Sequence, residues 1–336
     1  MGHKVRRLLG AQRPTRGMRL TGCLFISYLL APVTAWSQLA DGNHSEVELH
    51  HAVGPVFNNS TDSDGLTVQR QGAIIIPWFD HADRFTGIEW TQLHISQAEQ
   101  NYQGQSFRLV TQNINPRTAL GWSSKLGVSD VQGSQLLLAD LKWDIRFNSF
   151  IQGGVSYSRD WIDSLTGIDR RLHYDAVNLS TEIKPWARIT AVISPTFTTF
   201  SDAGKRRSVY QAITWDALPT LGITLQASIK EDVGSAPSNP ELPRAYFNPT
   251  SLSETLTTIG WRSRIQNWRV YGKVSMGTQK VAYVGGQPMY VVEIGSSSPL
   301  TQKSVVRWRL GEKHSSGLSG PDYTYRYVEG ELLIPF

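Results

Sequence analysis

The chain has 336 residues, with 33 lysines and arginines, 28 acids and one cysteine. Six of the cations lie in residues 1–19, which leaves 27 against the 28 acids, so the charge does not indicate a nucleic-acid partner. A single cysteine excludes a disulfide scaffold, and the sequence carries no metal-ligand spacing, phosphate loop or nucleotide motif, so we expect no cofactor, no metal and no catalytic residues.

The first 37 residues have the order of a secretory signal peptide. A basic stretch, residues 1–19, is followed by an apolar run, residues 20–33, and then by the small-x-small triplet Ala35-Trp36-Ser37. We expect cleavage after Ser37, with Ala35 as the alternative site and Met18 as an alternative start. Cleavage also removes Cys23 and leaves residues 38–46 as a short periplasmic segment.

From residue 47 onward, apolar and polar residues alternate with the period of a strand that has one apolar and one wet face. The clearest stretch is 137–148, where Leu141 and Trp143 alternate with Lys142. The expected strands are 47–57, 66–76, 85–95, 105–113, 119–128, 137–148, 151–161, 172–183, 187–197, 207–215, 221–229, 257–265, 268–276, 287–296, 306–310 and 323–336. About sixteen strands, an even number, predict an all-β fold: a transmembrane antiparallel up-and-down β-barrel of outer-membrane type over residues 47–336.

The connections between these strands support the same topology. With the amino-terminus in the periplasm, every second connection is expected to be a tight turn, and the others are free to lengthen. The expected periplasmic connections are 77–84, 148–149, 184–186, 216–219, 266–267 and 297–301. The expected outer connections include the short 130–134 and the longer 96–104, 162–170, 231–254 and 314–322, of which 231–254 is the long extracellular loop.

The last strand, 323–336, ends the chain on Phe336. A final strand with a terminal aromatic resembles the closing strand of outer-membrane β-barrels, in which it is the signal read by the outer-membrane assembly machinery. The resemblance implies a location in the bacterial outer membrane. The alternative is an edge strand of a soluble β-sandwich, such as an enzyme or a lectin, but a sandwich does not predict alternating turn lengths.

The long loop carries the motif Tyr246-Phe247-Asn248-Pro249, which precedes the strand 257–265. This motif is similar to one in the carboxy-terminal barrels of bacterial exopolysaccharide export porins, of the poly-N-acetylglucosamine export porin and cellulose synthase outer-membrane subunit type. The resemblance implies a barrel of about sixteen strands and a polysaccharide cargo. Those porins carry periplasmic helical repeats before the barrel, and this sequence shows none. Either a separate periplasmic scaffold or inner-membrane synthase is a partner, or this protein has a different function from those porins.

Charged and phenolic side chains alternate with the apolar ones and should line the lumen. The expected lumenal cations are Arg108, Lys125, Lys142, Arg146, Arg188, Lys230, Arg262, Arg264, Arg269, Lys273, Arg307 and Arg309, against Glu89, Asp140, Asp144, Glu293, Glu329 and Glu331. Tyr271, Tyr323, Tyr325 and Tyr327 suit stacking against sugar rings. Few acids are expected near the cluster of Arg262, Arg264, Arg269, Arg307 and Arg309. Such an excess of cations in a pore selects for anions.

The favoured hypothesis is therefore a conduit for an exported anionic or partly anionic exopolysaccharide, embedded in outer-membrane lipid. One alternative is a general diffusion porin or structural barrel, in which 231–254 folds inward. A second is a lipid or ester hydrolase, for which His81 with Asp80 and Asp83, His94 with Ser96, and His314 with Ser315 and Ser316 are the candidate groups. Pairing of lumenal cations with acids would leave no charge to meet a substrate.

Overall fold

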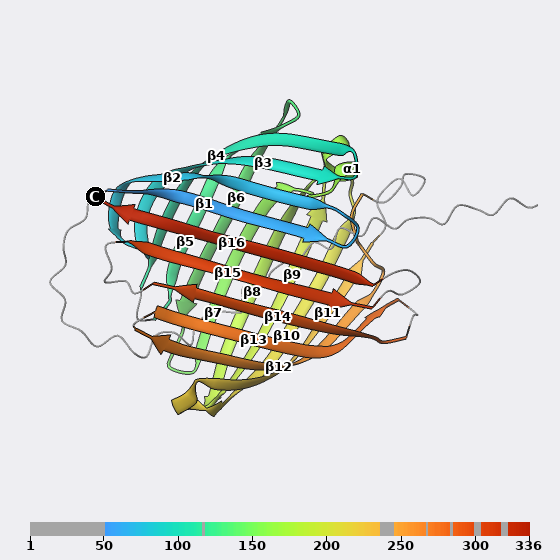
Figure 1. Cartoon of the computed structure of the whole chain (residues 1–336). Coiled ribbons are helices and arrows are strands. Elements are labelled where there is room, and N and C mark those ends of the chain that lie inside the picture. The colour runs from blue at the N-terminus through green and yellow to red at the C-terminus, as the bar shows by residue number, and fades with distance from the viewer. Residues whose placement is uncertain are drawn as a thin grey trace, which may run out of the picture.

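The computed structural model describes residues 51–115, 118–235, 245–266, 268–282, 285–298, 304–316 and 322–336. Over these ranges the chain forms sixteen strands in one closed antiparallel barrel, in which each strand pairs with its neighbours in sequence and β16 pairs with β1 (Figure 1). The predicted fold class is confirmed. The signal peptide 1–37 and the segment 38–46 lie outside the described residues.

Each of the sixteen predicted strands overlaps one observed strand, in the predicted order. The strands are β1 (Ala52–Asp62), β2 (Thr67–His81), β3 (Arg84–Gln97), β4 (Gln100–Ile114), β5 (Gly121–Val131), β6 (Ser134–Arg146), β7 (Ile151–Trp161), β8 (His173–Trp186), β9 (Ile189–Phe200), β10 (Lys205–Leu218), β11 (Ile223–Gly234), β12 (Leu252–Ile265), β13 (Trp268–Val281), β14 (Gln287–Ser297), β15 (Val305–Ser315) and β16 (Tyr323–Pro335). The helices are short: α1 (Leu165–Asp169) and the 3-10 turn η2 (Pro219–Leu221). No helix in the described ranges is long and apolar enough to cross a membrane.

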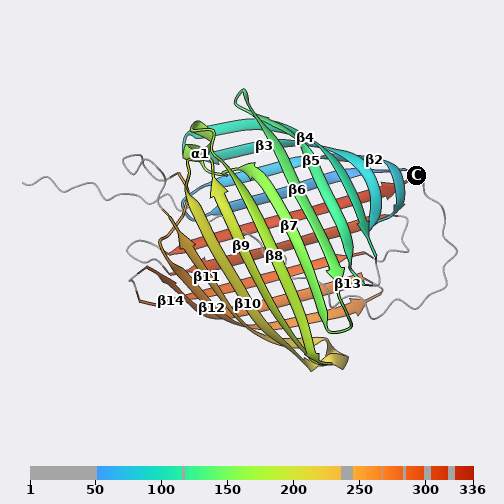
Figure 2. The same cartoon turned by 180° about the vertical axis from the view of Figure 1, so that it is seen from behind.

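Apolar side chains cover the outer surface of the barrel. The outward side chains of Trp143 and Met276 are 56% and 66% exposed. Glu89 and Glu293, which face the inside of the barrel, are buried. Closure of the sheet pairs the backbone groups of each strand with those of its two neighbours. The division of side chains leaves an apolar exterior. A barrel in lipid requires both. Figure 2 shows β6 to β11 as the wall behind the one formed by β12 to β16 and β1 in Figure 1.

We call the end of the barrel that holds Ala52 and Pro335 the terminal end, and the opposite end the loop end. The two longest gaps between strands, 162–172 and 235–251, both lie at the loop end, as predicted. The second is shorter than the predicted 231–254, because β11 and β12 continue to pair through Asp232 and Leu252.

Two predicted connections are wrong in length. The predicted connection 96–104 is a turn of two residues, 98–99, and the predicted 77–84 reduces to 82–83, because pairing of β2 with β3 continues past two register shifts to His81. Ala98 has a φ of 53°, a conformation that usually requires glycine or asparagine. The sequence therefore lacks the residue that would have marked this turn.

Apolar side chains also fill part of the inside of the barrel, at both ends. The loop-end cluster packs α1 against the inner faces of β2, β3, β5 and β6; it consists of Leu66, Val68, Leu93, Ile95, Val131, Leu136, Leu138, Trp161, Leu165 and Ile168. The terminal-end cluster joins the β2–β3 turn to β1, β4, β15 and β16; it consists of Ala52, Ile74, Ile76, Phe79, Ala82, Phe85, Val110, Val305 and Leu333. The expectation that apolar positions face only lipid is therefore wrong at these two levels.

Candidate functional site in the barrel lumen

The predicted cationic cluster on β12 to β15 is largely paired with acids. Arg307 contacts Glu331 on β16 and Asp83 in the β2–β3 turn, each at 2.9 Å, and Arg309 forms an ion pair with Glu329. Arg262 lies 3.3 Å from Asp216, near the end of β10. The prediction that this cluster has few acids nearby is wrong for these three arginines, because their partners come from distant parts of the sequence.

Arg264 and Arg269 are the members of the cluster that keep a like-charged neighbour. The strand register places them directly opposite each other on β12 and β13. Like charges opposite each other in a sheet repel, and the charge of Asp83 in the β2–β3 turn offsets part of this repulsion at Arg269. Lys142 pairs with Asp144 on its own strand at 2.8 Å, and Arg146, at the end of that strand, is exposed.

The predicted two-to-one excess of cations in the lumen does not hold over the described residues. Further acids occupy inward positions and hold cations, for example Glu254 with Lys313 at 2.8 Å and Asp232 with Lys230 at 3.1 Å. The acids that the prediction missed are Asp83, Asp160, Asp163, Glu182, Asp216, Asp232 and Glu254. The prediction also missed the inward cations Arg70, Lys184, Arg206 and Lys313, so an excess of cations remains but is smaller than two to one.

The tyrosines predicted to line the lumen lie against the barrel wall. A Cβ atom on Gly311 would sit 2.5 Å from the Tyr327 hydroxyl, and one on Gly295 would sit 2.6 Å from the Tyr271 ring, so both rings lie flat on a glycine of the next strand. Tyr327 is buried, its hydroxyl donates to Glu293, and Arg309 covers its ring at 5.9 Å. The Tyr327 ring is thus not an open stacking platform.

Tyr323 and Tyr325 continue the same inner row of β16 toward the loop end. The Tyr323 hydroxyl donates to Asp62 at 3.3 Å, and the Tyr325 ring is tilted against Tyr327 with centroids 6.0 Å apart. Lys273 contacts Glu293 at 3.1 Å. The predicted phenolic row is thus joined to the ionised residues around it.

The motif Tyr246–Pro249 fastens the 245–251 segment to the hairpin of β9 and β10. The buried Arg206 donates to the Phe247 carbonyl and, at 3.2 Å, to Asn248 Oδ1, while the Asn248 amide donates to the Ser235 carbonyl at 2.7 Å. The Tyr246 ring stacks on Phe200 with centroids 4.1 Å apart. The motif therefore has a structural role here and does not project as a free loop.

Replacing Arg206 by methionine should free this motif. The change keeps much of the side-chain length but removes the donors to Phe247 and Asn248, and leaving such buried acceptors unsatisfied costs about 1–3 kcal/mol. We expect faster proteolysis within 245–251 and a lower melting temperature. The matched control is Arg207→Met, since Arg207 is exposed on the opposite face of β10. Equal protease sensitivity of the two variants would contradict the proposed anchoring.

The sequence predicted a connection at 162–170 but not that this segment, 162–172 in the structure, enters the loop end of the barrel (Figure 1). Arg70 Nη2 on β2 donates to both carboxylate oxygens of Asp163 at 2.7 Å, and Tyr102 on β4 donates to Asp169. Ser164 caps α1 and donates to the Ala245 carbonyl at 2.6 Å. The segment thus joins the β2–β4 wall to the Tyr246–Pro249 motif.

The electrostatics of Asp163 depend on its place inside the barrel. Burial raises the pKa of the Asp163 carboxyl above its usual range, and the charge of Arg70 opposes that shift. A charge-assisted hydrogen bond between a guanidinium and a carboxylate is among the stronger polar contacts in proteins. Arg70 therefore holds the one acid that the segment places against β2.

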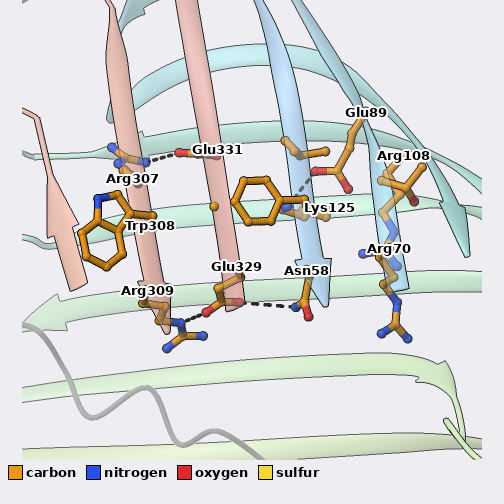
Figure 3. Close-up of a pocket in the computed structure, with 14 residues that line it drawn as sticks. Asn58, Arg70, Glu89, Arg108, Lys125, Arg307, Trp308, Arg309, Glu329 and Glu331 are labelled. Carbon is orange, nitrogen blue, oxygen red and sulfur yellow. Dashed lines mark hydrogen bonds and ion pairs between the residues drawn. The ribbon is translucent and has the colours of Figure 1, made fainter. Parts of the chain in front are cut away.

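A cavity with a volume of about 360 Å³ lies at the seam of β1 and β16 (Figure 3). Its lining combines ionised residues of the inner wall with Phe57 and Trp308, which lie on the outer face of β1 and β15. Cations and acids both line it; in order around the wall the ionised residues are Arg307 and Arg309, Glu329 and Glu331, Arg70, Glu89, Arg108 and Lys125. We call these eight residues the charged belt. Lys125 contacts Glu89 at 2.8 Å, and Asn58 on β1 donates to Glu329 at 3.3 Å.

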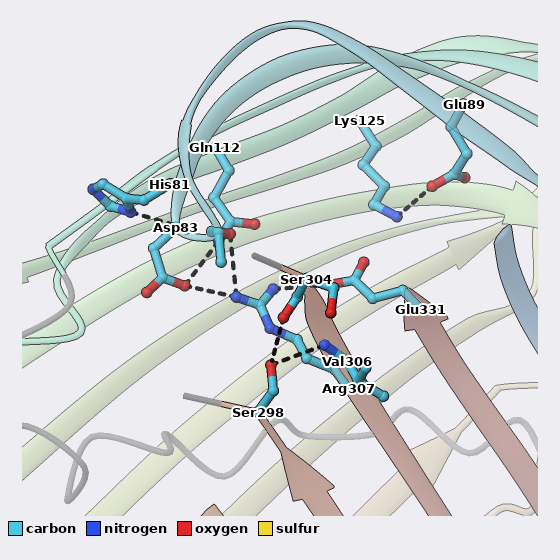
Figure 4. Close-up of polar contacts among 11 residues, drawn as sticks. His81, Asp83, Glu89, Gln112, Lys125, Ser298, Ser304, Val306, Arg307 and Glu331 are labelled. Atoms are coloured by element: carbon cyan, nitrogen blue, oxygen red, sulfur yellow. Dashed lines mark hydrogen bonds and ion pairs between the residues drawn. The ribbon is translucent and has the colours of Figure 1, made fainter. Parts of the chain in front are cut away.

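The terminal side of the charged belt is covered by the β2–β3 turn (Figure 4). Arg307 donates to the Ala82 carbonyl at 3.1 Å as well as to Asp83, and Gln112 of β4 also donates to Ala82 at 3.4 Å. The turn is folded inward over strands on both sides of the seam, and Arg307 is the residue that ties it to β15.

In the candidate hydrolase groups around His81 and His314, the imidazole is hydrogen-bonded to a group other than a candidate serine. His314 is hydrogen-bonded to Thr324 at 3.0 Å and stacks on Tyr290, while Ser315 faces the opposite side of β15 and is buried. His81 accepts from the backbone of Asp83 within the turn, and Asp80 pairs with Arg84. His94 and Ser96 lie on one face of β3 two positions apart.

No protein-family model matches the chain, and no curated protein matches it in sequence. Its fold is similar to that of a bacterial polysaccharide outer membrane secretin, with a TM-score of 0.63 and 12% identity over 86% of this chain and 100% of that one. Lower scores relate it to OccK5 (OpdH) of Pseudomonas aeruginosa, at 0.43 and 9% identity over 86% and 98%, and to the anion-selective porin of Comamonas acidovorans, at 0.37 and 9% over 85% and 98%. The fold is thus that of an outer-membrane β-barrel.

Proposed function

We propose that this protein is an outer-membrane channel through which an exported polysaccharide passes. The single observation that carries the proposal is the closed barrel with an apolar exterior and a continuous ionised inner wall next to a cavity. Similarity of the whole barrel to a polysaccharide outer membrane secretin supports this choice of cargo. The terminal end would face the periplasm, where a separate scaffold or an inner-membrane synthase would deliver the polysaccharide.

The paired lumen bears on the charge of the cargo. Rings of unpaired cations select for anions, but many inward cations of this barrel lie about 3 Å from an acid, among them Lys125, Lys230, Lys273 and Lys313. The expected preference for an anionic polymer is therefore weak, and hydrogen bonding to hydroxyl groups becomes the main contact with the cargo.

Proteoliposomes test the proposal directly. Labelled oligosaccharides of increasing length are trapped inside vesicles that contain the protein, and their release is followed. A conduit should release long and short chains alike, because a chain threads through end first. Release that stops above a short length would support a diffusion porin, and a protein that forms no pore in bilayers would refute the channel.

One observation favours the diffusion porin as the second candidate. The 162–172 segment folds into the barrel and is held there by Arg70. The segment therefore narrows the lumen at the loop end. Under the porin alternative, the sequence placed such a segment at 231–254, of which residues 236–244 lie outside the described residues; the connection between β7 and β8 is a further inward segment. A fixed constriction suits small solutes, and a movable one is required for a polymer.

A further inference from the structure

We propose that the charged belt is a binding site for uncharged saccharide units. The proposal rests on the proposed function, because it names the chemical class of sugar that the channel would hold. The volume of the cavity, about 360 Å³, lies within the range of small-molecule sites. A sugar ring and part of its neighbour would be held against β15, β16 and β1 to β5.

The position of the belt along the barrel makes it a polar compartment. On β3 the inner row runs from Phe85 of the terminal-end cluster through Glu89 to Leu93 and Ile95 of the loop-end cluster. On β2, Arg70 is likewise placed between Val68 and Ile74. Apolar side chains therefore bound the ionised residues of β2 and β3 on both sides, and along these two strands a hydrophilic ligand meets ionised partners at this level.

The charge of the belt argues for a neutral ligand. Its five cations, Arg70, Arg108, Lys125, Arg307 and Arg309, face its own acids Glu89, Glu329 and Glu331 and are also held by Asp83, Asp160 and Asp163. An anionic sugar would have to displace one of these carboxylates and leave it buried without a cation, which is costly. A hydroxyl group can accept from a guanidinium and donate to a carboxylate at once, so it adds to the pairs without breaking them.

The guanidinium groups are also held in fixed positions. Arg70 is fixed by Asp163 of the 162–172 segment, and Arg307 is fixed by Asp83 of the β2–β3 turn. A guanidinium has five N–H donors, and these contacts use only part of them. Because the binding groups are already ordered, little side-chain entropy is lost when a sugar binds.

The test uses the full-length mature protein in planar bilayers. The blockers are three oligosaccharides of equal length: a neutral cello-oligosaccharide, an oligogalacturonate that carries carboxylates, and a cationic chitosan oligomer. The neutral one should block at the lowest concentration. Tighter block by the anionic or the cationic oligomer would overturn the proposal.

The decisive variant is Arg309→Met/Glu329→Leu, which removes one donor and one acceptor together and keeps the net charge. We expect the neutral oligosaccharide to bind about tenfold more weakly. The matched control is Lys230→Gln, which alters an inward ion pair on β11 outside the belt and should leave binding within about twofold of the wild type. Unchanged binding in the double variant would refute the site.

Calorimetric titration of the detergent-solubilised protein with the neutral oligosaccharide separates the two proposals. If ions pass through the pore but no oligosaccharide blocks it or binds in solution, the site is wrong and the channel stands. If no pore forms but the calorimeter records binding that the double variant loses, the site stands and the channel is wrong. Thermal melting of both variants checks that they are folded; the double variant is expected to melt near the wild type, and the control lower, because Lys230→Gln leaves the buried Asp232 without its cation.

Discussion

An Arg70→Met channel is expected to conduct more current than the wild type. The variant removes Arg70 from the partly buried Asp163 carboxylate, and the lost ion pair makes the inward position of that carboxylate less favourable. The 162–172 segment can then move this carboxylate into water, since it is a short connection between two strands. Single-channel conductance in planar bilayers measures the result.

Two further variants show whether the segment is responsible. Arg70→Met/Asp163→Leu replaces the pair by apolar side chains, an exchange that is often neutral for stability, so its conductance should return toward the wild-type value. Arg326→Met removes an exposed arginine from the outer face of β16 and should have no effect. If the double variant conducts as much as Arg70→Met, the loss of a lumenal charge and not the release of the segment explains the increase.

The sequence predicted the strands well because their signal is local. A residue that faces lipid and the next one that faces the lumen differ in polarity, so Leu141, Lys142 and Trp143 identify a strand without reference to any other segment. The closing strand is equally plain, since β16 alternates up to Pro335 and pairs with both β15 and β1. The order of strands around the barrel then follows from the sequence order.

The ion pairs and the inward segments could not be read in the same way. Asp83 meets Arg307 across 224 residues of sequence, and Arg70 meets Asp163 across 93. Such contacts depend on the register of many strands and on the direction in which a connection folds. The predicted two-to-one excess of cations was wrong for this reason. The count took each strand by itself and omitted acids in turns and on neighbouring strands that lie next to the lumenal cations.

One feature of the 162–172 segment was visible in the sequence. Leu165 and Ile168 are three positions apart, as on one face of a helix, and Ser164 precedes them as a cap. A helix of five residues is too short for periodicity to separate it from a loop. The inner apolar positions Leu93 and Ile95 were the stronger clue, because apolar residues on the lumenal face of a strand need a partner inside the barrel.

Deletion of Phe336 is expected to prevent assembly in the outer membrane while leaving the folded barrel almost as stable as before. The Phe336 ring is 70% exposed and touches only the His51 ring among its described aromatic contacts, at 5.8 Å between centroids. The paired part of β16 ends at Pro335, which faces Ala52, so the deletion removes only one backbone hydrogen bond at the seam, from Phe336 N–H to the His51 carbonyl at 3.0 Å. A terminal aromatic that adds so little to the fold is free to act as the recognition signal of the assembly machinery.

Two measurements separate recognition from stability. The amount of heat-modifiable protein in outer-membrane fractions should fall strongly on deletion of Phe336, and the melting temperature of the same variant refolded in detergent should stay near that of the wild type. Phe336→Tyr keeps an aromatic ring at the carboxy-terminus and should assemble normally. A deletion variant that reaches the membrane at the wild-type level shows that Phe336 is not the signal. One that melts much earlier in detergent shows that the ring stabilises the seam, because contacts within the barrel are the same in detergent and in lipid.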